Sequence, residues 1–309
     1  MKILLTGATG FIGGKLAQRL SQEGHELVIL TRDAHRASTQ LGLPCQAIAC
    51  DLLSAPPPVA AFSEVNAVIH LAGESIAGRW TADRKQKIHD SRVLGTRNLV
   101  KAFKSPGVNA PAVFISPSAI GIYGDRGDEV LSENSAPGQG FLSEVCRDWE
   151  TETENAAGPK TRAIILRLGM VLGPGGGALA QMLTPFSLGL GAELGTGKQW
   201  MSWVHIDNVI DAFCFALQNT QIAGILNVVA PQPVTNTEFT QTLAKVLKKK
   251  AYLTLPRPLL RFALGEMADA LLNSTKVLPS RLLSFGFKFS YATLFEALSQ
   301  IYGDSRSPR

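Results

Sequence analysis

The chain has 309 residues, enough for one large domain or two closely joined ones, with 45% hydrophobic residues, 18% charged residues and a formal net charge of +5. This composition excludes disordered and fibrous chains. Because no basic stripe carries aromatic residues between its charges, we expect an anionic small ligand and no nucleic-acid partner. No apolar stretch has the length of a membrane span, and the first residues run into Thr6 and Gly7 rather than a signal-peptide core, so we expect a cytoplasmic protein without a membrane partner.

The first predicted element is a strand, a glycine turn and a helix. Residues 2–5 are apolar, and Leu16 and Leu20 begin a helical spacing after the turn. The glycine spacing suits a tight bend, a close approach to a pyrophosphate and close helix packing, at Gly7, Gly10 and Gly13 in that order. Free N–H groups at the helix start would face the phosphates. An ordinary turn is the alternative, but the predicted strand at residues 26–30 favours a dinucleotide site. The predicted contacts from this loop are Gly7, Thr9, Gly10, Phe11, Ile12 and Gly13.

The end of the second strand selects the dinucleotide, because the ribose 2′ position lies there. Arg32 can form a bidentate hydrogen bond with the 2′-phosphate of NADP, and the Thr31 hydroxyl can add a further hydrogen bond. In the alternative, Arg32 is a solvated surface residue and Asp33 binds the ribose of NAD. We favour NADP.

Four cysteines lack both the spacing and the flanking histidines of a metal site: Cys45, Cys50, Cys146 and Cys214. We expect buried free thiols and no metal.

Later motifs follow one another in a familiar order and spacing. They are Ala67–Gly73, Gly95–Leu99, Val113–Ser116, Ile122–Gly124, Leu166–Pro174 and Trp203–Val209. Together they resemble the extended short-chain dehydrogenase/reductases, the group of sugar-nucleotide epimerases and dehydratases. Segments at Arg147–Glu150, Pro185–Gly191, Leu278–Pro279 and Gly286–Phe289 resemble an atypical subgroup called epimerase-family proteins.

The resemblance implies an α/β fold, a Rossmann-type doubly wound parallel sheet with a smaller C-terminal substrate lobe. The NADP-binding domain is expected at residues 1–172, with residues 203–230 returning to it. Residues 173–309 are expected to form mainly the substrate lobe and a C-terminal helical cap, with a frayed end at residues 305–309.

The resemblance also assigns further cofactor contacts. Asp51 and Leu52 are expected at the adenine, and Val171 at the nicotinamide end. Contacts along the ends of the fourth and fifth strands are expected from Leu71, Ala72, Gly73 and Ser116. For Leu71 and Val171, a plain core position is an equal alternative.

The acid/base pair of the resembled family, a tyrosine four residues before a lysine, is missing. Its positions hold Leu142 and Cys146, or Phe141 and Val145 after a shift of one residue. Ser118 and Tyr123 follow the fifth strand, so Tyr123 is the predicted proton donor and Ser118 the predicted substrate-binding hydroxyl.

Arg92 replaces a family asparagine on the helix after the fourth strand, where its cation could bind a cofactor phosphate, assisted by Lys87. The alternative is a solvated helix face. For His205 and Glu150 we expect structural roles rather than catalysis.

These motifs predict an NADP(H)-dependent oxidoreductase or epimerase-like enzyme acting on a small polar substrate. The alternative is a regulatory or sensor protein that binds NADP(H) without chemistry. The sequence leaves the oligomeric state open.

Overall fold

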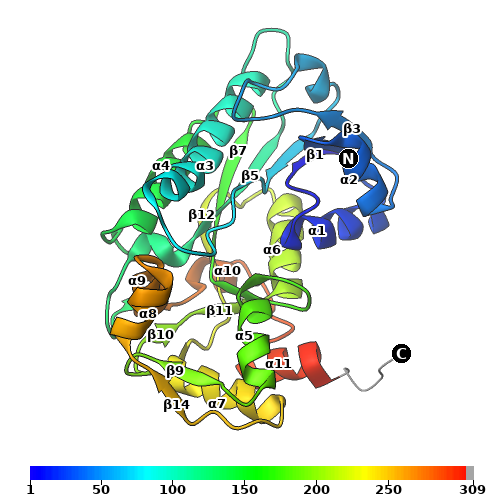
Figure 1. Cartoon of the computed structure of the whole chain (residues 1–309). Helices are drawn as coiled ribbons and strands as arrows, with labels where there is room; N and C mark the ends of the chain where they lie inside the picture. Colours follow the sequence, from blue (N-terminus) through cyan, green and yellow to red (C-terminus); the bar gives the residue numbers. More distant parts are fainter. Residues whose placement is uncertain (304–309) are drawn as a thin grey trace.

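A computed structural model describes residues 1–303, and the expected fraying of residues 305–309 lies outside them. Its centre is a seven-stranded parallel sheet in the order β12-β7-β5-β4-β1-β2-β3 (Figure 1). The strands are β1 (Lys2–Thr6), β2 (Glu26–Thr31), β3 (Gln46–Ala49), β4 (Ala67–His70), β5 (Val113–Ala119), β7 (Arg162–Leu168) and β12 (Gly224–Val228). The strand order reverses between β1 and β4, which creates a crevice at the carboxyl ends of these strands. The predicted doubly wound α/β fold is confirmed.

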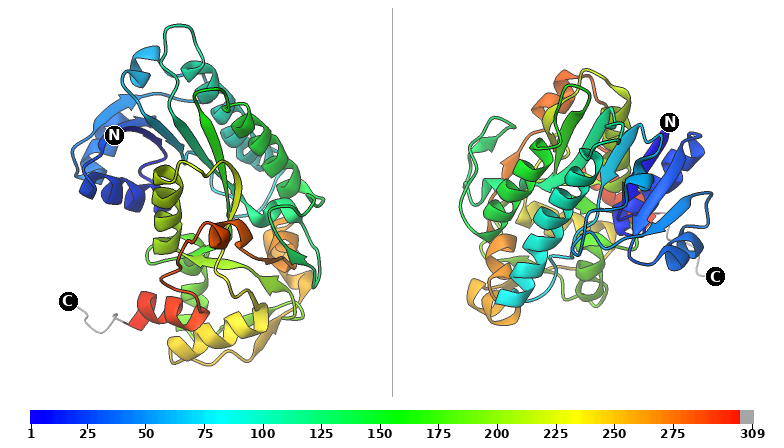
Figure 2. Two further views of the ribbon diagram at one scale, coloured as in Figure 1. Left: turned by 180° about the vertical axis from the view of Figure 1, so that it is seen from behind. Right: turned by 90° about the horizontal axis from the view of Figure 1, so that it is seen from above.

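Helices cover both faces of the sheet (Figures 1 and 2). One face carries α1 (Phe11–Gln22), α2 (Ala34–Leu41) and α6 (Ile206–Gln218), and the other carries α3 (Ala82–Phe103), α4 (Phe141–Glu154) and the short 3-10 helix η1 (Val59–Phe62). Alternation along β1 explains this layering, because Ile3 and Leu5 face the α1 core while Leu4 faces the α3 core.

The second half of the chain builds the smaller lobe around its own apolar core. Its elements are β8 (Met170–Leu172), α5 (Gly177–Ser187), β9 (Ala192–Leu194), β10 (Trp200–Met201), β11 (Trp203–His205), β13 (Val234–Thr235), α7 (Asn236–Val246), β14 (Leu253–Leu255), α8 (Arg257–Leu264), α9 (Met267–Leu272) and α11 (Leu294–Gly303). Since β12 belongs to the central sheet, the chain returns there after the lobe begins. The boundary at residue 172 stays a prediction.

The tail is less uniformly helical than its spacing predicts. Besides α10 (Ser280–Ser284), it contains β15 (Lys276–Val277), which pairs in parallel with β6 (Val130–Leu131) just after the 3-10 helix η2 (Ile120–Tyr123). A strand of two residues depends on its partner rather than on its own pattern.

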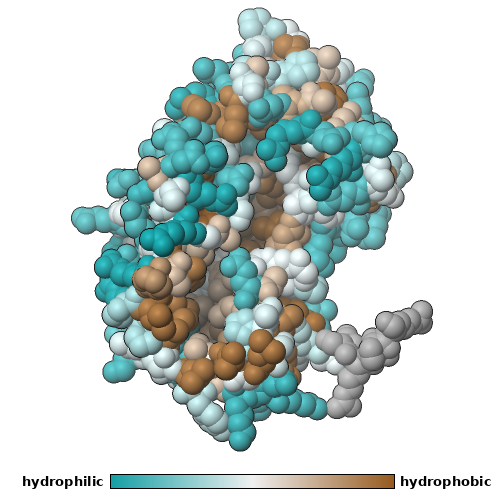
Figure 3. All heavy atoms as spheres, in the orientation of Figure 1, coloured by the Kyte–Doolittle hydropathy of each residue, from teal (hydrophilic) through white to brown (hydrophobic). Residues whose placement is uncertain are grey.

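The space-filling view shows a hollow between the sheet domain and the lobe, and exposed hydrophobic side chains around α8 (Figure 3). No helix within residues 1–303 combines the length and the apolarity needed to cross a bilayer.

Candidate functional site

The glycine turn sits at the crevice, and two of its glycines are sterically required. Gly7 has a φ of +68°, and a Cβ there would lie 2.6 Å from the Leu71 carbonyl carbon and oxygen. A Cβ on Gly13 would lie 2.1 Å from the Gly7 carbonyl oxygen, whereas one on Gly10 would meet that oxygen at 3.2 Å. No side chain caps the N-terminus of α1. The helix therefore keeps its first N–H groups and its positive dipole end for an anion.

Phe11, a predicted cofactor contact, uses its side chain to hold the lobe. Its ring fills the space beside Gly173, Gly176 and Gly177, where a Cβ on Gly176 would lie 2.4 Å from Phe11 Cδ2. Ile12 packs against the α1-side core, as does Val171. For Phe11 and Ile12, the main-chain N–H groups at the helix start, rather than the side chains, are available to an anion in the crevice.

Arg32 and Asp33, which follow β2, have different roles. The Asp33 carboxylate caps α2 by accepting the Arg36 N–H at 2.9 Å. Arg32 is exposed and forms no ion pair within residues 1–303. Because Asp33 is committed to the helix cap while Arg32 is available, this geometry favours a phosphorylated ribose over a bare one.

Asp51 is exposed at the next strand end. Hydrogen bonds from the Ser54 hydroxyl and the Leu53 N–H lower the pKa of Asp51, and the charge of Arg32 acts in the same direction. Leu52 is half-buried against the α3-side core.

The end of β4 is fixed by a buried hydrogen-bond chain. Thr6 Oγ1 accepts the N–H groups of Leu71 and Ala72, both at 3.1 Å, and lies 2.7 Å from His70 Nδ1. Burial, together with the charge of Arg92, lowers the pKa of His70 to about 4. Because Thr6 Oγ1 already accepts two N–H groups, its own O–H donates a hydrogen bond to Nδ1 of the neutral His70. The Nε2 atom of His70 has no partner among the described residues.

Ser116 and Tyr123 do not line the crevice, which corrects both predictions. Ser116 is 0% exposed, and its hydroxyl donates to the Pro117 carbonyl. Tyr123 is also 0% exposed, with its hydroxyl 2.7 Å from Asn227 Oδ1 and 2.9 Å from Arg167 Nη1, which donates to it. Burial raises the pKa of Tyr123, against the opposing influence of Arg167. The phenol is a structural group in the interior.

A buried ion pair holds that phenol in place. Arg167 donates from Nε and Nη2 to the two carboxylate oxygens of Glu150, at 2.8 and 2.7 Å. Glu133 accepts the main-chain N–H groups of Asn227 and Arg281, which links β12 to α10. Glu150 therefore has the expected structural role, whereas Glu133, Arg167 and Asn227 were missed, because their partners are distant in sequence.

Arg92 and Lys87 point to different sides of α3. Lys87 is 63% exposed and pairs with Asp83 at 2.9 Å, and its cofactor contact stays a prediction. Arg92 is half-buried, with its Cζ 5.3 Å from the Trp149 ring centre, and a Cβ on Gly73 would lie 3.5 Å from that same Cζ. The guanidinium therefore lies between α4 and the exposed end of β4.

Ser118 and Cys146 occupy the interior behind Arg92. Ser118 is 3% exposed, and its hydroxyl faces the Cys146 thiol without a well-formed hydrogen bond to any described residue. Burial raises the pKa of Cys146 to about 11, so the thiol stays neutral and is a poor nucleophile. All four cysteines are free, but Cys45 and Cys50 are only half-buried, contrary to expectation.

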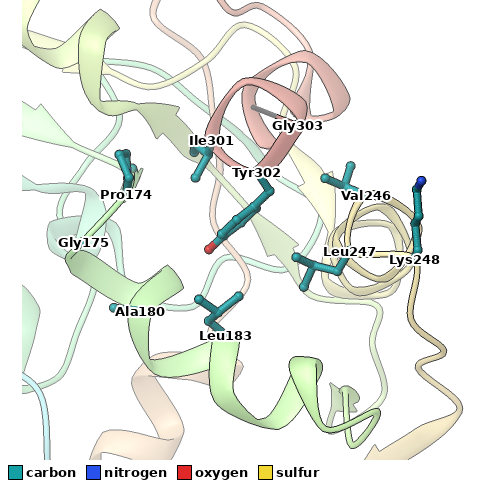
Figure 4. A pocket seen from close by; sticks show the side chains of 11 residues that line it. Pro174, Gly175, Ala180, Leu183, Val246, Leu247, Lys248, Ile301, Tyr302 and Gly303 are labelled. Atoms are coloured by element: carbon teal, nitrogen blue, oxygen red, sulfur yellow. The ribbon is translucent and has the colours of Figure 1, made fainter. Parts of the chain in front are cut away.

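Other features lie away from the crevice. His205 caps α6 by accepting the Asp207 N–H and contacts Gln300, as expected for a structural residue. A separate pocket of about 900 Å³ lies between α5, α7 and α11, where Tyr302 points toward Leu183 (Figure 4). Within residues 1–303, no group of three or more histidine, cysteine or acidic residues could hold a metal ion.

Comparison with known proteins gives consistent matches. The profile described as the NAD dependent epimerase/dehydratase family matches residues 3–228, and a domain of unknown function matches residues 255–301. The crystal structure of human epimerase family protein SDR39U1 (isoform 2) with NADPH superimposes with a TM-score of 0.87 at 33% identity, covering 98% of this chain and 100% of that one.

Curated relatives cover similar lengths. A chloroplastic SDR39U1 homolog from Arabidopsis thaliana is 37% identical over 303 residues, covering 97% of this chain and 86% of the relative. Epimerase family protein YfhF from Bacillus subtilis is 34% identical, covering 99% of this chain and 100% of the relative.

Proposed function

Because this chain belongs to the NAD dependent epimerase/dehydratase family, as its motifs predict, we propose that it is an NADP(H)-binding oxidoreductase or epimerase-like enzyme acting on a small polar substrate. The observation that carries the cofactor choice is the free Arg32 beside an Asp33 that is already used as a helix cap. The NADPH in the crystal structure of the human relative supports the same choice.

The crevice fits a dinucleotide phosphate. The tight packing at Gly7 and Gly13 holds the uncapped start of α1 against the sheet, and its N–H groups would bind the pyrophosphate. Arg32, with the Thr31 hydroxyl beside it, would bind the 2′-phosphate. Asp51 and Leu52 would flank the adenine, and the ends of β4 and β8 would line the remainder through Leu71, Ala72, Gly73 and Val171.

Bound nicotinamide supplies the hydride acceptor or donor. The residues of the chain must position the substrate carbon and exclude water, because the tyrosine and lysine of the resembled family are replaced by Leu142 and Cys146. Ser118 is the hydroxyl that we assign to a substrate oxygen, since it is buried at the end of β5 and lacks another partner. The comparisons do not favour the non-catalytic alternative.

Calorimetric titration with NADPH and NADH tests the cofactor assignment. We expect tighter binding of NADPH, and a loss of roughly 10-fold to 100-fold for Arg32→Asp, because a charge-assisted hydrogen bond contributes about 1.5–3 kcal/mol. Lys101→Asp makes the same charge change at the far, exposed end of α3 and should leave NADPH affinity unchanged. Equal affinity of the unmodified protein for both dinucleotides would refute the role of Arg32.

Isotope exchange tests for chemistry. NADPH deuterated at C4 is incubated with the protein and a panel of polar aldehydes and ketones, and we expect stereospecific loss of deuterium with at least one of them. Retention of the label across the whole panel would count against an enzyme.

A further inference from the structure

Buried polar groups without partners gather between α3 and α4. The Ser118 hydroxyl and the Trp149 indole N–H, 3% and 6% exposed as residues, make no hydrogen bond to the described residues. Arg92 packs on the Trp149 ring, and both Arg92 and Ser118 lie close enough to the Cys146 thiol to lower its pKa against the effect of burial, so the four side chains are neighbours. Native interiors satisfy nearly all such groups with protein, water or ligand partners, so this cluster is a candidate place for a polar ligand.

Arg92 is held at one end and free at the other. Its Nη1 donates to the carbonyl oxygens of Glu74 and Ile88, both at 3.0 Å. Its Nε and Nη2 donate to no described residue. The stacked Trp149 ring fixes the guanidinium plane, so the Nε–Nη2 edge forms a positioned fork.

Arg92 forms no ion pair with any described residue, although the Glu74 carboxylate lies close enough to favour its charged form. The Glu74 carboxylate pairs with Arg84 at 3.1 Å, and the Glu150 carboxylate pairs with Arg167 at 2.7 Å. Cys146 is a neutral thiol, and His70 is a neutral imidazole. An unpaired, half-buried cation is costly unless an anion joins it.

Arg92 reaches the end of β4 from a different helix than the one that the pyrophosphate loop begins. Arg92 is on α3, whereas the loop leads into α1, on the opposite face of the sheet. Its neighbours Ser118 and Cys146 lie at the end of β5 and on α4, where the proposed function has the reacting carbon.

We infer that the Nε–Nη2 edge of Arg92 binds a carboxylate group of the substrate, with the Ser118 hydroxyl directed at the oxygen on the neighbouring carbon. This inference rests on the proposed function and defines its substrate class as a small carboxylic acid with an adjacent hydroxyl or carbonyl. Arg92 thus binds substrate rather than the cofactor phosphate that the sequence analysis assigned to it.

Calorimetry on the NADPH-loaded protein tests this, with oxamate as the carboxylate probe and oxamide as its neutral match. We expect oxamate to bind at least 10-fold tighter than oxamide and than inorganic phosphate. Arg92→Gln should weaken oxamate at least 10-fold and Arg92→Lys less, with NADPH affinity within twofold. Arg97→Gln is the control, since Arg97 lies on the same helix but pairs with Glu152.

Several results would overturn the inference. They are no oxamate binding, equal binding of oxamate and oxamide, a preference for phosphate, or an Arg92→Gln variant that loses NADPH rather than oxamate. If Arg92→Gln does not fold, the oxamate and oxamide comparison on the unmodified protein still decides. Failure of the unmodified protein to bind NADPH would refute the proposed function, and oxamate titration of that same protein would then test Arg92 separately.

Discussion

Neighbouring glycines in the first turn of α1 allow a matched test of the dinucleotide loop. Gly13 and Gly14 both lie in the helix, so replacement by alanine brings each the same propensity gain of about 1 kcal/mol. Their surroundings differ, because a Cβ on Gly13 would lie 2.1 Å from the Gly7 oxygen and 2.9 Å from Ala8 Cα, whereas one on Gly14 would lie 3.6 Å from the Ala8 oxygen.

We therefore expect opposite results. Gly14→Ala should be neutral or stabilise by up to about 1 kcal/mol. Gly13→Ala must move main-chain atoms, and overpacking of this kind costs about 1–3 kcal/mol, so a net loss of up to about 2 kcal/mol should remain. The movement also displaces the Gly7 carbonyl and the N–H groups at the helix start, so NADPH affinity should fall at least 10-fold in Gly13→Ala alone.

Urea unfolding and calorimetric titration of NADPH measure both effects. If Gly13→Ala and Gly14→Ala have the same unfolding midpoint and the same NADPH affinity, the steric explanation of the loop is wrong.

Two further predictions concern the interior. Tyr123→Phe should lower the free energy of unfolding by about 1–3 kcal/mol, because Arg167 and Asn227 each lose a buried partner, while NADPH affinity stays unchanged; urea unfolding without a loss would contradict the structural role. His70 binds a proton less readily when folded, with a pKa of about 4 against 6.5, so its contribution is complete above pH 6.5 and is lost as the pH falls toward 4. At pH 5 the stability lost relative to neutral pH is about 2 kcal/mol. His70→Asn should remove that part of the pH dependence of unfolding, and an unchanged dependence would show that another group causes it.

Local patterns predicted the features that depend on neighbouring residues. The bend at Gly7, the packing at Gly13 and the exposure of Arg32 follow from steric and charge requirements within one strand–turn–helix unit. The sheet order was accessible through the family resemblance, whose motifs mark each strand end.

Features that depend on distant residues were not predictable. Tyr123 looked like a residue of the crevice, but it is buried by Asn227, 104 residues later, and by Arg167. The ladder between β6 and β15 likewise joins segments with no common pattern. Lys87 is different, because helix geometry alone separates it from Arg92 by about 140° around the axis and argues against a shared ligand.

Because the Phe11 ring packs against the loop that begins at Gly173, residues 11 and 176 can change only together although they are far apart in sequence. A side chain at residue 176 would occupy the volume of the benzyl group, and a smaller residue at position 11 would leave that volume empty. During evolution, Gly176 can therefore be replaced by a larger residue only if residue 11 becomes smaller. The sequence of the nucleotide loop and the sequence of the lobe are thus expected to vary together at these two positions.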